Sequence, residues 1–593
     1  MDQLAIDENL PPLERIKKYT ASDIALQRCV ATRCAAFFSP LNYWRPCVIM
    51  FRLVHVKSMA DTARQMGFEE SLETLTVIIQ DRVEDEETDV RLTLAEQIGE
   101  LANIFVETGG EEGYSQTVDM LLSQTGKLLV DAQATVRSAA GQALVQIAQR
   151  LTKEHLESPV LGMVLCLAHD ESEDHRQLAA QLLNEMATAF DKDLCCNFCV
   201  PELRSLAEDQ EFGVRKAAAR NMSFICKTVG QEVSEEKMLP VFVQLSKDEI
   251  WGVRKSCAEA LSDMSACMPS SCRSDDLVQV FMRLQGDMSR WVRFAAFQQL
   301  GPLIATMEPE EVSPEILKQF TSMAHGEGET TLYCAFNFPG VLYTVNASRW
   351  DQLKESYMML VKDVQWKVRR SLAHSLHKIA EILGTEVTES DICEQVFDVF
   401  LKDLDEVRVG VLKNFAAFMT VLSPQKRKSY LEVMAQSYLE ADNIGRDWRV
   451  RKILATEVGP LTEILELSDI QETLEPTLFT FATDPVAEVR NAAHLAFGPL
   501  LMRYQVEGGD FALRDGVIDK IRAFVVSEQY VDRQIYVHIC EKLYTSADSI
   551  ELLEKFFLRS VLGMGKDRVA NVRLAVARLC SALLKERAFG NPG

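Results

Sequence analysis

The stretch DQEFGVRKAAARNMSFICKTVG, residues 209–230, carries the pattern from which most of the chain is built. It has an acid, an arginine six residues later with a valine just before it, and then alanines and larger apolar residues at helical spacing. The pattern returns at a fixed interval. Its arginines include Arg137, Arg176, Arg215, Arg254 and Arg293, each 39 residues after the last. A fixed period in this range indicates a solenoid of stacked repeats.

The residues around and after these arginines are predicted to form amphipathic helices. Their apolar positions are spaced four, four, three and four residues apart, as in one stripe of an α-helix. They are Val136, Ala140, Leu144, Ile147 and Leu151 in one repeat, and Val253, Cys257, Leu261, Met264 and Met268 in another. A shorter apolar segment precedes each. Pro201 and Pro240 lie 14 residues before the arginine, so this first helix is expected to be kinked or to begin late.

Further copies of the pattern continue to the end of the chain. One is degenerate, with Leu332 in the arginine's place, and the others place arginine at Arg91, Arg369, Arg408, Arg451, Arg490, Arg533 and Arg573. Because each helix pair buries one stripe internally and another against the next pair, stacking makes one continuous core. We therefore expect an all-α chain, an α-solenoid of about 13 to 14 repeats whose second helices line a concave surface.

The repeats also suggest how the chain is divided. We expect an N-terminal helical lead-in with an irregular segment, a first array, a polar linker that is a candidate hinge, a second array and a frayed tail. These are residues 1–67 with the irregular segment at 37–59, then 68–305, 306–330, 331–585 and 586–593.

Composition narrows the function classes. The formal charge of −24 disfavours nucleic acid as a partner, because nucleic-acid binders carry basic stripes. The 15 cysteines are an odd number, irregularly spread, and read as reduced thiols. No metal is expected at Cys195, Cys196 and Cys199, since a second cysteine pair is missing. With neither a signal-like N-terminus nor a long apolar run, we expect no membrane contact and a place in the cytoplasm or nucleus.

The sequence contains none of the common catalytic motifs. The sequence lacks the phosphate-binding, dinucleotide-binding, nucleophile-elbow and zinc-protease motifs, and it contains no His-Glu dipeptide. Its nine histidines occur singly on predicted helices. We therefore expect neither enzymatic activity nor a cofactor.

The recurring acid and arginine are interpreted as structural, because an active site would occur once. The acid sits six residues before the arginine at Asp85, Asp131, Asp170, Asp209, Asp248, Asp287, Asp363, Asp484 and Asp567. In the turn between helices, a carboxylate can accept hydrogen bonds from the next helix's first N–H groups and from an arginine of a neighbouring repeat. We expect a ladder of such contacts that includes Asp131, Arg137, Asp209, Arg215, Asp484, Arg490, Asp567 and Arg573.

Tryptophan is concentrated in the same turns. Four of the six tryptophans lie one or two residues before the valine, namely Trp251, Trp291, Trp366 and Trp448. Each indole could pack over the adjacent turn. Alternatively, a row of indoles beside arginines could form the centre of a protein interface. Other turns have Thr135, Gly213 or Ala570 at this place, so packing does not require tryptophan everywhere.

The repeated Asp-x-x-x-x-Val-Arg turn resembles that of HEAT repeats, which implies a curved superhelix of the armadillo type. More closely, DEIWGVRKSCAEA, DMSRWVRFAAFQQLGPLI, DVQWKVRRSLAHSLHKIAEILG and FLKDLDEVRVGVLKNF resemble the protein phosphatase 4 regulatory subunit 1 family. A more distant likeness is to the scaffold subunit of protein phosphatase 2A. The likeness covers most of the chain, but it breaks at residues 37–59 and lacks the family's long acidic insertion before CAFNFPG.

The resemblance implies a noncatalytic scaffold that binds a type 2A-like serine/threonine phosphatase catalytic subunit and directs it to phosphoprotein substrates. By matching motif, the catalytic subunit is expected on Trp366, Arg369, Asp405, Arg408, Trp448 and Arg451. Substrate or a further subunit is expected on Trp251, Arg254, Trp291 and Arg293. The alternatives are a karyopherin-like transport receptor, which would carry its tryptophans on inner helices rather than in turns, and a general assembly scaffold.

Overall fold

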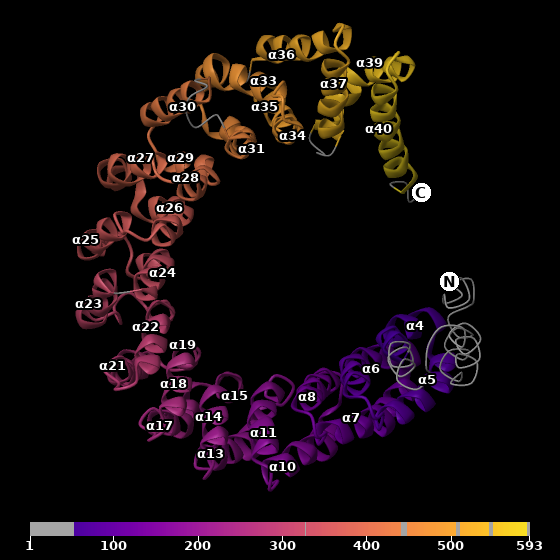
Figure 1. Cartoon of the computed structure of the whole chain (residues 1–593), viewed down its shortest axis with the longest axis vertical. Coiled ribbons are helices and arrows are strands. Elements are labelled where there is room, and N and C mark those ends of the chain that lie inside the picture. The colour runs from indigo at the N-terminus through magenta and orange to yellow at the C-terminus, as the bar shows by residue number, and fades with distance from the viewer. Residues whose placement is uncertain (1–51, 327, 440–446, 506–509, 545–548, 590–593) are drawn as a thin grey trace, which may run out of the picture. The chain divides into compact units, whose positions relative to one another are not determined.

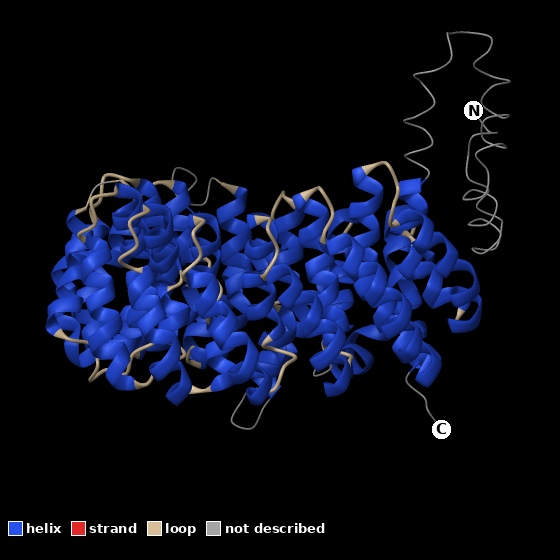
Figure 2. Ribbon diagram, turned by 90° about the horizontal axis from the view of Figure 1, so that it is seen from below, coloured by secondary structure: helices blue, strands red, loops and turns tan. Residues whose placement is uncertain are grey.

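The computed structural model describes residues 52–326, 328–439, 447–505, 510–544 and 549–589. Within these ranges the chain is helical and contains no strand, and short loops connect the helices (Figure 2). The expected all-α fold is confirmed. Residues 1–51, which include most of the lead-in and the first part of the irregular segment, lie outside the described residues. Of that segment, residues 52–57 are helical, which differs from the irregular structure we expected.

The chain divides into two compact units, Met1–Met307 (unit 1) and Glu308–Gly593 (unit 2), and each is described by itself. The division falls within the polar stretch at residues 306–330. The proposed hinge stays a prediction.

Unit 1 is a stack of helix pairs. Its longer helices are α4 (Met59–Met66), α5 (Phe68–Arg82), α6 (Thr88–Gln116), α7 (Leu122–Leu129), α8 (Ala134–Ala148), α10 (Leu161–Ala168), α11 (Glu173–Met186), α13 (Val200–Ala207), α14 (Phe212–Arg220), α15 (Ser223–Val229), α17 (Leu239–Leu245), α18 (Trp251–Glu259), α19 (Leu261–Ser265), α21 (Val278–Gln285) and α22 (Arg290–Ile304). The second helices α8, α11, α14, α18 and α22 pack directly on one another. Figure 1 shows them on the inner side of unit 1, with α10, α13, α17 and α21 outside.

Most first helices of unit 1 contain a π-helical segment of five residues at the same place in the repeat. These segments are η1 (Thr117–Leu121), η2 (Leu156–Val160), η3 (Cys195–Cys199), η4 (Ser234–Met238) and η5 (Arg273–Leu277). Pro201 and Pro240 follow directly, in the first turn of α13 and α17. Proline has no N–H group to donate and so cannot continue the hydrogen bonding of an α-helix. The change from π-helix to α-helix therefore falls beside these prolines.

Unit 2 repeats the plan with less regular spacing. Its longer helices are α23 (Pro314–Ser322), α24 (Glu329–Val345), α25 (Trp350–Val361), α26 (Trp366–Val387), α28 (Asp405–Leu412), α29 (Phe415–Val421), α30 (Pro424–Leu439), α31 (Trp448–Ile464), α33 (Glu475–Ala482), α34 (Ala487–His494), α35 (Phe497–Gln505), α36 (Phe511–Ala523), α37 (Tyr530–Tyr544), α39 (Leu558–Gly563) and α40 (Ala570–Phe589). Here the second helices α24, α26, α28, α31, α34, α37 and α40 pack successively. The C-terminal tail expected to fray from residue 586 is helical to Phe589.

The helices α6 and α26 each contain a sharp change of direction at a glycine. Gly110 has a φ of 56° and Gly384 a φ of 75°, which only glycine adopts readily. The chain leaves a second helix at these glycines and enters the first helix of the next repeat.

The core consists of the predicted helix stripes. Val136, Ala140, Leu144 and Ile147 are fully buried, and so are all five members of the stripe that begins at Val253. Leu151 is half-buried. The apolar periodicity of the second helices therefore predicted their buried faces.

Candidate functional site

The turn between the two helices of a repeat is built around its acid. The Oδ1 atom of Asp209 accepts a hydrogen bond from the backbone N of Glu211 at 2.8 Å. Asp248 binds the N–H of Ile250 in the same way, also at 2.8 Å. The carboxylate therefore satisfies an N–H group at the start of the second helix, which has no partner within the helix.

The same carboxylate binds an arginine of the preceding repeat. Arg215 donates from Nε to Asp248 at 2.7 Å and from Nη2 at 3.2 Å, a two-point contact. Its remaining nitrogen, Nη1, donates to the backbone oxygens of Asp209 and Gln210, at the start of its own turn. We call the set of such pairs the ladder. Its members are Arg91–Asp131, Arg176–Asp209, Arg215–Asp248 and Arg254–Asp287 in unit 1, and Arg369–Asp403, Arg451–Asp484 and Arg533–Asp567 in unit 2.

Both partners of a ladder pair stay charged at neutral pH. The hydrogen bond from Arg254 lowers the pKa of Asp287 against the opposing effect of burial, and the same bond raises the pKa of Arg254. In the same way, the hydrogen bond between Arg369 and Asp403 lowers the pKa of Asp403 and raises the pKa of Arg369. Where a ladder pair is present, one turn is thus held to the next by a charged contact that lies partly out of solvent.

The ladder is not continuous, and two of its interruptions involve a turn acid without a ladder arginine. Arg137 reaches Asp174 on α11 at 2.6 Å instead of the turn acid Asp170, which lies 3.1 Å from Nδ1 of His175. In unit 2, Asp363 binds the N–H of Gln365 at 2.7 Å, but Leu332 stands where the preceding repeat would supply an arginine.

The remaining predicted arginines contact their own turns. Arg293, Arg490 and Arg573 donate to the backbone oxygens of Asp287, Asp484 and Asp567, all from Nη1. Arg408 donates to the backbone oxygens of Leu401 and Asp403, and it lies 3.1 Å from the carboxylate of Asp405.

The turn tryptophans reach the surface. Trp251 is 48% exposed and Trp291 is 50% exposed, both in unit 1. In unit 2, Trp366 and Trp448 are half-buried. A different tryptophan, Trp350, is buried and donates from Nε1 to Asp391 at 2.8 Å, so the chain also uses an indole for packing.

Arginine side chains lie over three of the four turn indoles. The guanidinium carbon of Arg290 is 4.6 Å from the ring centre of Trp291, that of Arg449 is 4.8 Å from Trp448, and that of Arg370 is 6.0 Å from Trp366. A cation within about 6 Å of an indole face is attracted to it. These arginines differ from the ladder arginines and remain near the surface beside the rings.

Other exposed apolar residues share these turns, and our sequence reasoning missed them. Met288 and Val364, each directly after a turn acid, are 97% and 95% exposed. We define the turn ridge of unit 1 as Phe212, Ile250, Trp251, Met288 and Trp291, and the turn ridge of unit 2 as Val364, Trp366, Leu404 and Trp448. Aligning the repeats on their acids would have placed Met288, Val364 and Leu404 at one equivalent position.

The ladder limits which turn residues can meet a partner. The side chains of Arg254, Arg369 and Arg451 are only 18%, 16% and 15% exposed and are engaged with carboxylates. The indoles of Trp251 and Trp291 and their apolar neighbours are therefore more accessible than these arginines, which hold the turns in place.

The described residues offer no constellation of histidine, cysteine, aspartate and glutamate that could hold a metal. Cys195 and Cys199 are buried free thiols. In the same ranges, no helix is both long and apolar enough to cross a membrane.

Comparison with known proteins identifies the repeat type. Residues 160–262 match the family model for HEAT repeats. The chain therefore contains HEAT repeats. Residues 334–437 match the model for the protein phosphatase 4 regulatory subunit 1 middle domain.

The chain is also similar to curated proteins named serine/threonine-protein phosphatase 4 regulatory subunit 1. It is 32% identical to those of Mus musculus and Homo sapiens over 290 residues, which is 47% of this chain and 30% of each relative. The match therefore spans less than a third of the length of these relatives.

Solved structures with a similar fold are helical transport receptors. Importin beta superposes with a TM-score of 0.55 at 12% identity, covering 94% of this chain and 78% of importin beta. The Kap95:Nup1 complex gives a TM-score of 0.56 at 12% identity, covering 97% and 81%. At this identity the likeness shows the α-solenoid fold alone.

Proposed function

We propose that the chain is a noncatalytic regulatory subunit of a type 2A-like serine/threonine phosphatase, similar to protein phosphatase 4. It binds the catalytic subunit and directs it to phosphoprotein substrates. The observation that carries the proposal is the 32% identity over 290 residues to regulatory subunit 1 of protein phosphatase 4. The middle-domain match at residues 334–437 agrees with it.

The catalytic subunit docks on the turn ridge of unit 2 in this proposal. The middle-domain match contains Trp366, Arg369, Asp405 and Arg408, and Trp448 and Arg451 lie in the following repeat. A partly exposed indole fixed on a helix start loses little conformational freedom on binding, and aromatic anchors of this kind carry much of the energy of protein interfaces. The ladder pairs Arg369–Asp403 and Arg451–Asp484 hold the turns that present Trp366 and Trp448.

The turn ridge of unit 1 would then receive a substrate or a further subunit. Trp251 and Trp291 supply its exposed aromatic area, and Arg254 and Arg293 fix the two turns. We place the reaction itself on the bound enzyme, so this chain contributes surfaces rather than catalytic groups.

Replacing both Trp366 and Trp448 with alanine tests the docking site. We expect the affinity for the phosphatase catalytic subunit to fall at least about thirtyfold, since a central interface tryptophan is typically worth about 2 kcal/mol or more. Binding is measured by quantitative pull-down of the purified catalytic subunit, and helicity and melting are followed by circular dichroism.

The matched control is Tyr343→Ala, because Tyr343 is a 77% exposed aromatic residue of unit 2 that lies within α24 and not in a turn. It should leave binding unchanged. If the double variant binds like the wild type, the ridge of unit 2 is not the docking site. A parallel loss of helicity and binding would instead assign the two indoles to packing.

A further inference from the structure

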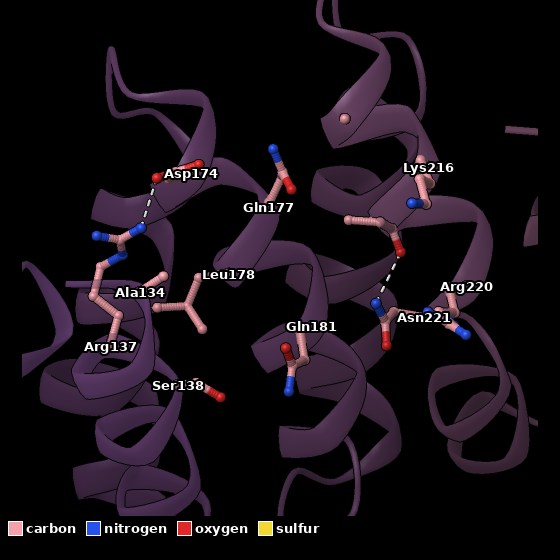
Figure 3. A pocket seen from close by; sticks show the side chains of 12 residues that line it. Ala134, Arg137, Ser138, Asp174, Gln177, Leu178, Gln181, Lys216, Arg220 and Asn221 are labelled. Atoms are coloured by element: carbon pink, nitrogen blue, oxygen red, sulfur yellow. Dashed lines mark hydrogen bonds and ion pairs between the residues drawn. The ribbon is translucent and has the colours of Figure 1, made fainter. Parts of the chain in front are cut away.

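A groove lies on the inner side of unit 1, where α8, α11 and α14 pack. Its cavity volume is about 330 Å³, and side chains of all three helices line it. Figure 3 shows Arg137 paired with Asp174 on one side and Asn221 bonded to the backbone on the other. Gln177 and Gln181 lie between them, and Lys216 lies on the side of Asn221 (Figure 3). The groove shares no lining residue with the turn ridges, although Gly213 directly follows Phe212.

The groove coincides with the ladder interruption in unit 1. Arg137 does not bind Asp170, the acid of the following turn. It binds Asp174 instead, and the side chain of Asp174 borders the groove. Gly213 provides space on the other side: a Cβ there would lie 2.6 Å from Nε2 of Gln177. The interrupted ladder at Arg137 and the glycine at position 213 thus both shape this place.

The lining of the groove contains more cations than acids, although the chain as a whole has a formal charge of −24. Arg137, Lys216 and Arg220 line it, and α14 contains no acid, whereas α11 also carries Glu173 and Glu185 outside the lining. Lys216 is exposed and has no acidic partner in the described part of the chain. Arg220 lies 3.4 Å from Glu259 and is itself exposed. The one acid in the lining, Asp174, is neutralised by Arg137.

Amide groups supply the remaining polar contacts. Gln177 makes no hydrogen bond within the described chain, so both its donor and its acceptor are available. Gln181 donates to Glu185 at 2.8 Å, and Asn221 donates to the backbone oxygen of Ala217 at 2.8 Å. Both keep a carbonyl oxygen that can accept from a main-chain N–H group.

We propose that this groove binds an extended, aspartate- and glutamate-rich segment of a partner protein. The amides of Gln177, Gln181 and Asn221 bind its main chain, and Lys216 and Arg220 attract its carboxylates. Three helices at roughly 10 Å spacing span about 20 Å, which an extended chain covers with about six residues. The proposal goes beyond the phosphatase function and does not depend on which catalytic subunit is bound.

Carboxylates suit the groove better than a phosphate group. Arg137 already donates to Asp174 and to the backbone oxygens of Asp131 and Ala132, so it cannot offer a two-point contact to phosphate. The two other cations are exposed and act mainly through their charge, which favours several spread carboxylates over one concentrated anion.

The test uses the full chain and an eight-residue fluorescent peptide in which glutamate alternates with serine. Binding is measured by fluorescence anisotropy at low ionic strength, where charge attraction is weakly screened. Lys216→Gln with Arg220→Gln should weaken binding about tenfold. The matched control is Lys192→Gln with Arg204→Gln, which makes the same charge change at exposed positions on the first-helix side and should weaken binding less than twofold.

Two further peptides decide what is recognised. A peptide with lysine in place of glutamate should not bind, and one with phosphoserine in place of glutamate should bind no more tightly than the glutamate peptide. Equal losses in the two double variants would overturn the groove as the site. Preference for the lysine or the phosphoserine peptide would overturn the assignment of its ligand. Circular dichroism checks that every variant is folded.

Discussion

Replacing Asp484 with alanine is expected to lower the free energy of unfolding of unit 2 by about 3 kcal/mol. The side chain of Asp484 is only 2% exposed. It accepts from Nε and Nη2 of Arg451 at 2.7 and 3.0 Å and from the backbone N of Val486 at 2.8 Å. The substitution removes the carboxylate that Arg451 binds and, with it, the acceptor for the N–H of Val486 directly before α34, and it leaves a partly buried positive charge.

A second aspartate separates these two contributions. Asp363 caps its turn through the N–H of Gln365 at 2.7 Å, but it has no ladder arginine because Leu332 occupies that place. Asp363→Ala should therefore cost only about 1 kcal/mol, the typical value of a helix cap. Urea denaturation of both variants measures the difference, and equal losses would mean that the arginine contact adds no stability.

The stability of unit 2 should also fall as the pH decreases below about 6.5, because of His494. This histidine is 1% exposed. Its burial, followed by the neighbouring His538, lowers its pKa to about 3. In the unfolded chain a histidine titrates near pH 6.5, so unfolding takes up a proton at any pH between these two values. The free energy of unfolding should decrease by about 1.4 kcal/mol per pH unit, or about 2.5 kcal/mol between pH 6.5 and 4.5.

Replacing His494 with leucine isolates this contribution. The variant should be as stable as the wild type near pH 7 and should lose much less stability on acidification. A part of the slope should remain, since burial also lowers the pKa of His374 and His377. Denaturation at a series of pH values measures the slope. Replacing His325, which is exposed, provides the control. An unchanged slope in His494→Leu would assign the acid sensitivity to other groups.

The fold could be predicted from the sequence because its information is local and repeated. Each repeat carries its own apolar stripe, and Val253 and Cys257 are buried where the period placed them. The acids of the turns were visible for the same reason. The sequence did not predict which carboxylate each arginine binds, because the pairing depends on how one repeat stacks on the next.

The features that the sequence did not predict depend on side chains outside the repeated acid, valine and arginine pattern. Arg137 leaves the ladder where His175 replaces the usual valine and lies beside Asp170. The exposure of Met288 and Val364 follows from their place at the tip of a turn, which a search for helical periodicity does not examine. The π-helical segments were also missed, because the sequence marks only some of them, with a proline inside the segment or directly after it.

The regular placement of the π-helical segments makes the repeats of unit 1 interchangeable. The segments begin at Thr117, Leu156, Cys195, Ser234 and Arg273, at equal steps along the chain. Deleting or duplicating the residues between two successive segments would join equivalent points of two helix pairs. Every helix beyond the junction would then keep its place in the repeat. Recombination could therefore lengthen or shorten this half of the molecule by whole repeats, and the distance between the two surfaces that we propose on it would change without redesign of either.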